Sequence, residues 1–244
     1  LTPGVSTITD LKEEMGKKNG ETSINNRKFT ALYTAQTSLD FKGNKDTTGE
    51  LSLMKCTKTY RIVMLPFDNN QPGFVAENFD VRIKGSAALL DYKGDKLVDD
   101  NGALQNKPIT YIPYNEELVD NKDGTTEVEG EEIKKALVYD LSSSRMFERK
   151  NDVNNSNPDS KEYDDKRIVI TDKRSGKVIF NHSLPWFLAL CGERIEKGWA
   201  EQEYLDRQDH YTLVFYVPSP DTDFYMDTKI KVNGWVLNLR DIEL

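Results

Sequence analysis

Short stretches of alternating apolar and polar residues run through most of the chain. Phe79, Val81 and Ile83 alternate with charged residues, as in a strand with one face buried and the other in water. The clearest alternation covers residues 211–217 and ends at Pro218, a residue type that seldom continues a strand. By the same criterion we predict further short strands at residues 60–65, 109–111, 137–141, 167–171 and 177–180.

Two dipeptides between apolar stretches have the composition of tight turns. Asn233-Gly234 gives the stronger signal and Ser175-Gly176 the second. Asn and Gly tolerate the positive φ that two-residue hairpin loops require. We therefore predict a hairpin at each position, with a β-bulge as the alternative at Asn233-Gly234.

Helical patterns are few and short. Residues 185–191 are predicted to form a helix, with Pro185 in its first turn and Gly192 available as a left-handed C-cap. A second short helix is predicted at residues 9–18, and a strand at residues 29–34. Many short strands with so few helices indicate an all-β sandwich with Greek-key connections.

Long acidic segments separate the predicted strands, at residues 94–107, 115–134 and 148–166. Loops of such length are uncommon in compact domains unless they carry function or are mobile. Two of these segments hold oxygen-rich turns, at residues 99–102 and 120–124, but neither keeps the ligand spacing of an EF-hand. We interpret both as solvated turns and predict no metal site.

The charge balance argues against a nucleic-acid partner. The 244 residues include 33 Lys and Arg against 41 Asp and Glu, a net charge of −8, whereas nucleic acids select basic surfaces. No apolar run approaches the roughly 18–20 residues that a membrane-spanning helix needs. The chain begins at Leu1 without a Met, so we expect that a leader was removed or that the chain was trimmed.

Catalytic constellations are missing from the sequence. His182 and His210 are the only histidines, and neither belongs to a nucleophile motif. Cys56 and Cys191 are too few for a disulfide framework or a zinc site, so we interpret each as a small buried residue. Among 41 acids a carboxylate pair can always be imagined, which leaves a glycosidase or other hydrolase without specific support. No phosphate-binding glycine motif occurs, and we expect neither an enzyme nor a cofactor.

Aromatic rings are the remaining candidate chemistry, because surface recognition of carbohydrate uses exposed Trp or Tyr platforms. Trp235 shares its alternation with Leu237 and Leu239, so we interpret it as core packing. The rings available for a platform are Trp186, Trp199, Trp235, Tyr92, Tyr114 and Tyr163.

The end of the chain carries the most specific sequence. QEYLDRQDHY at residues 202–211 is followed by an alternating strand, by IKVNGW at 230–235 and by DIEL at 241–244. This block resembles the C-terminal domain of the fimbrillin-associated anchor proteins, the anchor subunits of type V pili. LVYDLSSSRM at residues 137–146 and LMKCTKTYRI at 53–62 look like two further strands of the same family. The resemblance thus covers about residues 51–244 and is strongest in the last forty.

The resemblance implies a secreted lipoprotein of two tandem transthyretin-like β-sandwich domains. Such a protein is held at the outer membrane by a lipid on an N-terminal cysteine and is seated at the base of a fimbrium. The lipid-accepting cysteine and the signal peptide are not in this sequence. We therefore expect residues 1–49 to be a remnant or C-terminal part of a first sandwich domain. Residues 50–244 would form the C-terminal sandwich domain with its long acidic loops.

The family motifs are structural rather than catalytic. Asp206 and Arg207 are expected to fix the turn that enters the strand at Tyr211, by side-chain hydrogen bonds or an ion pair. Asn233 and Gly234 allow the backbone conformation of the closing hairpin, and a tryptophan would anchor the core. The motif residues are Tyr204, Leu205, Asp206, Arg207, Asn233, Gly234 and Trp235.

These observations predict a non-catalytic structural protein of the cell surface. It would be a fimbrial anchor or assembly subunit whose partners are a fimbrillin subunit and, through its lipid, the outer membrane. An extended segment of the fimbrial subunit would add a strand to a sheet edge. The alternative is a β-sandwich protein that binds surface polysaccharide.

Overall fold

The structure is a computed structural model of the chain. It describes residues 13–19, 22–37, 48–97, 108–121, 126–128, 131–148, 166–190, 192–217, 229–233 and 235–238.

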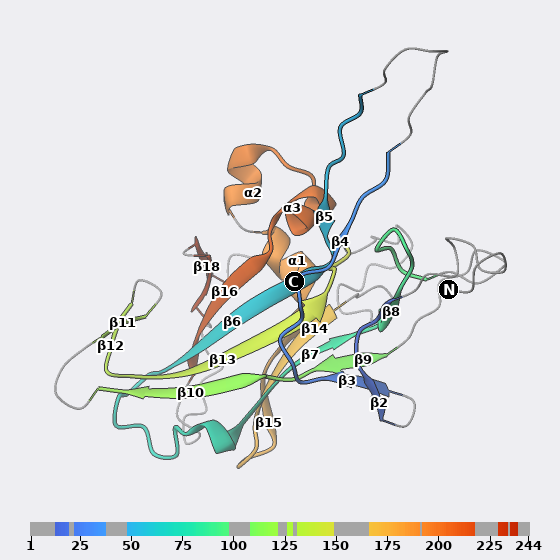
Figure 1. Ribbon diagram of the computed structural model, residues 1–244. Helices are drawn as coiled ribbons and strands as arrows, with labels where there is room; N and C mark the ends of the chain where they lie inside the picture. Colours follow the sequence, from blue (N-terminus) through green and yellow to red (C-terminus); the bar gives the residue numbers. More distant parts are fainter. Residues whose placement is uncertain are drawn as a thin grey trace, which may run out of the picture.

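Two open six-stranded sheets form the body of the protein (Figure 1). The first has the order β10-β13-β6-β16-β17-β18. Its strands are β10 (Asn115–Asp120), β13 (Lys135–Ser144), β6 (Thr57–Pro66), β16 (His210–Val217), β17 (Lys229–Val232) and β18 (Trp235–Asn238). The second has the order β15-β14-β7-β9-β3-β2. Its strands are β15 (Lys177–Ser183), β14 (Lys166–Asp172), β7 (Phe79–Gly85), β9 (Ile109–Tyr111), β3 (Thr22–Asn25) and β2 (Lys17–Asn19).

Short elements decorate the two sheets. Three strand pairs stand apart from them, namely β1 (Glu13–Glu14) with β8 (Leu89–Leu90), β4 (Tyr33–Thr34) with β5 (Met54–Lys55), and β11 (Thr126–Val128) with β12 (Glu131–Ile133). The helices are η2 (Ala76–Asn78), α1 (Leu184–Ala189), α2 (Gly192–Lys197) and α3 (Glu201–Arg207). The three α-helices connect β15 of the second sheet to β16 of the first.

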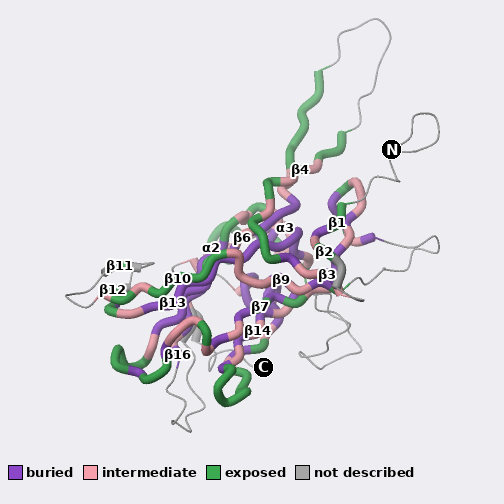
Figure 2. The backbone as a smooth tube through the Cα atoms, turned by 60° about the horizontal axis from the view of Figure 1, so that its bottom comes forward, coloured by how far each residue is buried: buried purple, intermediate pink, exposed green. Residues whose placement is uncertain are grey.

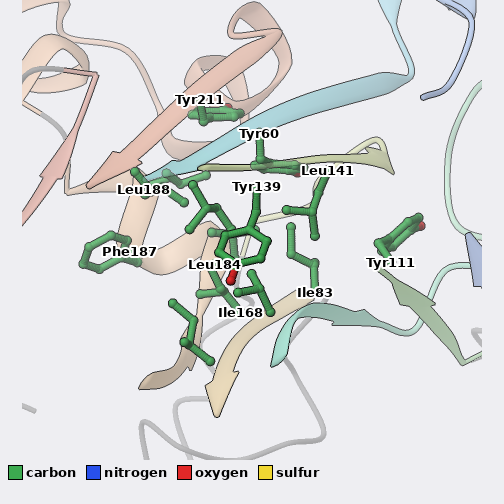
Figure 3. Packing of buried hydrophobic residues seen from close by; sticks show 14 of the residues in the cluster. Tyr60, Ile83, Tyr111, Tyr139, Leu141, Ile168, Leu184, Phe187, Leu188 and Tyr211 are labelled. Atoms are coloured by element: carbon green, nitrogen blue, oxygen red, sulfur yellow. The ribbon is translucent and has the colours of Figure 1, made fainter. Parts of the chain in front are cut away.

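The larger of two hydrophobic clusters among the described residues lies between the sheets (Figure 3). Phe180 of β15 packs edge-to-face on Phe215 of β16, with ring centroids 4.9 Å apart. Tyr60 of β6 and Tyr211 of β16 stack side by side at 5.8 Å. Helix α1 adds Phe187 to the same cluster. Both sheets contribute apolar side chains to this layer. A second, smaller cluster contains Val63 of β6, Val138 of β13 and Val214 of β16, so the middle strands of the first sheet are buried on both faces.

The all-β class predicted from the sequence is confirmed, and so are its clearest strands. β7 shows Phe79, Val81 and Ile83 buried, and β16 covers residues 210–217. Both predicted hairpins form: Gly176, with φ of 69°, lies in the β14–β15 turn, and β17 pairs with β18 around Asn233.

The helix predicted at residues 9–18 is wrong where the structure describes it. Residues 13–14 and 17–19 are strands instead. Met15 between them is buried, and its N–H donates to the carbonyl of Ala88 at 2.8 Å. Tertiary pairing thus overrides a weak helical pattern. The strand predicted at 29–34 shrinks to its last two residues, β4.

The acidic segment 115–134 is also not simply a loop, because it contains β10, β11 and β12. β10 is an edge strand with mostly exposed side chains, so its sequence lacks the alternation that marks a half-buried strand. The segment 192–207 likewise holds two helices, α2 and α3, where the sequence predicted only one helix before it.

Several predictions fall outside the described residues. These concern residues 1–12, the acidic turns at 99–102 and most of 120–124, Tyr163, Cys191 and the terminal residues 241–244. The division at residues 49 and 50 stays a prediction; before it, β2 and β3 join the second sheet through the parallel pair β3–β9.

Candidate functional site

Helix α3 is fastened to the end of β13 by a bidentate ion pair. Arg145 directly follows β13, and its Nε and Nη2 donate to Oδ1 and Oδ2 of Asp206 at 2.8 Å each. The same guanidinium pairs with Asp95 and donates to the carbonyl of Gly94 at 3.3 Å. A forked pair of this kind fixes orientation as well as adding stability. One arginine therefore joins β13, α3 and the turn at residues 91–95.

Lys58 of β6 is a buried cation beneath the same helix. Its Nζ donates to the carbonyls of Asp206 at 3.1 Å and Gln208 at 2.6 Å, and it lies 3.8 Å from Oδ1 of Asp209. Burial lowers the pKa of Lys58 to about 8, although Asp209 and Asp206 act to raise it. Lys58 thereby satisfies carbonyls at the C-terminal end of α3 that the helix itself leaves open.

This buried lysine predicts a specific pH dependence of stability. Its pKa falls from 10.5 to about 8 on folding, so between these pH values the unfolded chain binds more protons than the folded one. Stability contributed by Lys58 therefore rises with pH across this window. Relative to Lys58→Met, we expect the wild-type free energy of unfolding to gain roughly 1–3 kcal/mol from pH 8 to 10.5, measured by urea titration. Lys173→Met, at an exposed position, serves as control; equal pH profiles for all three proteins would contradict the prediction.

The predicted motif residues fall on α3 and on the β17–β18 hairpin. Tyr204 and Leu205 are fully buried on α3. Asp206 and Arg207, expected in a turn before the strand, form the last two residues of this helix. Arg207 pairs with Glu203 one turn earlier at 2.9 Å, in addition to the Asp206 pair described above.

Asn233 sits in the hairpin with a positive φ of 48°. Its Oδ1 accepts a hydrogen bond from the Thr212 N–H at 2.8 Å, and its own N–H donates to the Thr212 carbonyl at 2.9 Å. Gly234 and the side chain of Trp235 lie outside the described part of the chain. The structural roles assigned to the motif residues stay predictions.

Both sheets end in edges that pair with no further described strand, namely β10, β18, β15 and β2. β10 carries Glu116, Glu117 and Asp120, all exposed, and charges of this kind discourage pairing with another chain. β15 has the sequence KVIFNHS, and its Val178 is 51% exposed. Of these two edges, β15 is the less protected against an added strand.

A pocket of about 560 Å³ lies at the base of an arm that carries β4 and β5. The arm projects from one end of the body (Figure 1), and its described residues beyond the β4–β5 pair are exposed (Figure 2). The pocket is lined by Thr34, Ala35, Gln36, Thr37, Ser52, Met54, Tyr92 and Lys93. Of the aromatic candidates whose side chains the structure describes, Tyr92 is the one that lines this pocket.

His182, His210 and Cys56 have contacts that are explained by packing and hydrogen bonding. His210 Nδ1 lies 2.9 Å from Thr59 Oγ1, and the His182 ring packs on Phe180 at 4.6 Å. Cys56 is buried and unpaired, and burial raises the pKa of its thiol. Across the described ranges, no group of three His, Cys, Asp or Glu side chains gathers into a metal site. The same ranges contain no helix that is long and apolar enough to span a membrane.

Sequence reasoning singled out Asp206 but not its partners. Arg145 stood in the quoted stretch 137–146 without an assigned role, and Lys58 stood in 53–62. The signal that could have found Arg145 is a lone arginine directly after an otherwise uncharged run of serines. No pattern marks Lys58, because a buried lysine looks like any other lysine in the sequence.

The comparisons with known proteins agree with the sequence resemblance. A model of the family described as Mfa2, fimbrillin-A associated anchor proteins Mfa1 and Mfa2, matches residues 1–241. A search of curated proteins gave no match.

Solved structures share the fold over nearly the whole chain. A candidate polysaccharide-binding protein from Bacteroides thetaiotaomicron is 27% identical, with a TM-score of 0.67 over 98% of this chain and 69% of its own. A candidate adhesin from Bacteroides ovatus is 19% identical, with a TM-score of 0.69 over 100% of this chain and 69% of its own. The fimbrial anchor protein Mfa2 from Porphyromonas gingivalis is 14% identical, with a TM-score of 0.51 over 98% of this chain and 70% of its own.

Proposed function

Because this chain belongs to the Mfa2 family of fimbrillin-A associated anchor proteins, we propose that it attaches a fimbrium to the outer membrane as a non-catalytic structural subunit. The family match over residues 1–241 is the observation that carries this proposal. A lipid at the N-terminus of the full-length protein would hold it at the membrane. Its partner would be a fimbrillin subunit.

The attachment is proposed to work by strand addition at β15. An extended segment of the fimbrial subunit would pair its backbone with the outer edge of β15, and its alternate side chains would set the register. One feature favours this edge over β10: β15 has a single charged residue, Lys177. β10, in contrast, carries three acids on its edge. Both edges expose an apolar side chain, Val178 on β15 and Leu118 on β10.

A proline scan tests this mechanism. In an edge strand alternate N–H groups point outward, so prolines at those positions remove donors from the edge without breaking the existing ladder. The variants compared are those whose melting temperature stays within a few degrees of the wild type. Among them, we expect prolines in residues 178–182 to abolish capture of purified fimbrillin. Matched prolines in residues 116–119 of β10 should leave capture unchanged. Loss on β10 alone would move the site to that edge, and no loss on either strand would reject strand addition there.

The fold is proposed to be the transthyretin-like Greek-key sandwich. This is supported by the path of the chain, which crosses between the sheets from β6 to β7, β9 to β10, β13 to β14 and β15 to β16. Such alternation between two layers is typical of Greek-key connections.

Binding of surface polysaccharide is the second proposed function. It is favoured by the 27% identity to a protein that is itself a candidate polysaccharide binder. Attachment and carbohydrate binding are compatible in one molecule, because the two functions would use different surfaces.

A further inference from the structure

Two of the three walls of the pocket are extended segments of the arm. Ser52 and Met54 line the pocket, whereas the residues alternating with them, Leu51 and Leu53, are 55% and 65% exposed. This is the side-chain alternation of extended backbone. The facing wall is residues 34–37, which enter the arm from β4. The pocket therefore receives one side of this segment, which carries Ser52 and Met54, and the exposed leucines lie on the other side.

The third wall is a turn whose backbone is tightly held. Oδ1 of Asp91 accepts from the N–H groups of Lys93 at 2.8 Å and Asp95 at 2.9 Å. Thr34 Oγ1 donates to the Lys93 carbonyl at 3.0 Å, which ties the turn to the arm. Arg145 ties it to the body through Asp95. A wall braced in this way is preorganised, so a ligand would not have to order it.

Gly94 explains why the turn can lie so close to the body. Its φ is +80°, and a Cβ at this position would lie 2.4 Å from Cys56 Sγ. Only glycine fits such a contact without displacing its neighbours. The side chains before it, Tyr92 and Lys93, are consequently presented toward the pocket from a fixed backbone.

The pocket offers a particular combination of groups. Hydroxyl and amide side chains from Gln36, Thr37 and Ser52 both donate and accept hydrogen bonds. Tyr92 adds a partly exposed aromatic ring, and Lys93 Nζ lies 5.5 Å from the centroid of that ring. Among the described lining residues Lys93 is the sole charged side chain, on a protein whose acids outnumber its bases by 41 to 33.

We propose that this pocket binds a segment of polysaccharide that carries uronic acids. Sugar hydroxyls match the hydroxyl and amide groups of the two arm walls, and the apolar face of a sugar ring matches the Tyr92 ring. A carboxylate on the sugar pairs with Lys93. The pocket volume of about 560 Å³ falls within the range of small-molecule sites. This inference rests on the second proposed function and gives it a site.

The location of the pocket separates it from the proposed fimbrial edge. Figure 1 places the β4–β5 arm at the upper end of the molecule and β15 at the lower end. An anchor held to a fimbrium through β15 would therefore keep the pocket accessible for carbohydrate.

The test is isothermal titration calorimetry of the whole chain with two probes, a hexamer of galacturonic acid and maltohexaose as a neutral counterpart. We expect the acidic hexamer to bind the wild type and Tyr92→Ala to weaken that binding by roughly tenfold. Lys93→Gln should weaken only the acidic hexamer. Tyr33→Ala is the matched control, because Tyr33 is 51% exposed on the same arm but does not line the pocket.

Each outcome decides between the site and the function. If the wild type binds but Tyr92→Ala and Lys93→Gln bind equally well, polysaccharide binding stands and this pocket is rejected as its site. If the wild type binds neither hexamer and is not retained on a glycan array, both the second proposed function and its assignment to this pocket are rejected. The proposal of attachment through β15 is not affected by that result. If Tyr92→Ala reduces capture of fimbrillin and not of sugar, the pocket is a protein-binding site and the proposal is overturned.

Discussion

Replacing Phe180 by alanine is expected to lower the free energy of unfolding by about 3–5 kcal/mol, the usual cost of emptying a buried aromatic site. The ring lies 4.9 Å from Phe215 of β16 and 5.7 Å from Phe187 of α1. It therefore joins both sheets and the helix that leads from one to the other. Urea denaturation of the wild type and the variant, with the midpoint and slope compared, measures the loss.

The matched control lies in the same strand. Val178 is 51% exposed, so Val178→Ala should change the free energy of unfolding by less than about 0.5 kcal/mol. If Phe180→Ala were as mild as Val178→Ala, the contact between β15 and β16 would not be part of the core.

The second large effect is expected from Asp206→Ala, which should lower the free energy of unfolding by about 2–4 kcal/mol. The Arg145 side chain is only 10% exposed. Its guanidinium donates two hydrogen bonds of 2.8 Å to the Asp206 carboxylate, and the substitution removes both. Asp95 remains as a partner, so the cost is placed below that of a wholly unpaired buried charge. Chemical denaturation at neutral pH measures it.

An exposed pair on the same helix is the control for Asp206. Glu203 and Arg207 pair at 2.9 Å with side chains 42% and 57% exposed, and pairs in this setting contribute little because water screens them. Glu203→Ala should therefore cost no more than about 0.5 kcal/mol. Equal losses for Asp206→Ala and Glu203→Ala would show that Asp206 does not stabilise the attachment of α3.

Strands with one buried face could be predicted from the sequence, because there packing and periodicity agree. β7 is such a strand, because Val81 and Ile83 are buried and Arg82 is exposed. β16 instead alternates between two buried faces, since Leu213 belongs to the core between the sheets and Val214 to the smaller cluster. β10 is paired by its backbone along an exposed edge, so its side chains carry no trace of the pairing. α3 was missed because only Tyr204 and Leu205 of its seven residues are buried.

The polar contacts were the least predictable part. The end of β13 reads as a hydrophilic stretch, yet Ser143 and Ser144 are fully buried. Their hydroxyls bond to Tyr60 at 2.9 Å and Tyr111 at 2.8 Å. A buried polar group is tolerated when it is hydrogen-bonded, and the partners come from distant strands. The pocket at the arm also depends on tertiary structure, since Tyr92 and Ser52 line it from segments that are distant in the sequence.

The parallel pairing of β16 with β6 has a consequence for biogenesis. His210 lies opposite Thr59 and Val217 opposite Pro66, so the middle of the first sheet joins segments about 150 residues apart. Contacts of such long range slow folding, since a large loop must close before they form. While the chain is emerging from the ribosome or a translocation channel, the inner edge of β6 stays uncovered until the last residues arrive. We expect a chain that ends before residue 210 to aggregate through that edge. Addition of the C-terminal strand β16 is thus the step that completes folding of the first sheet.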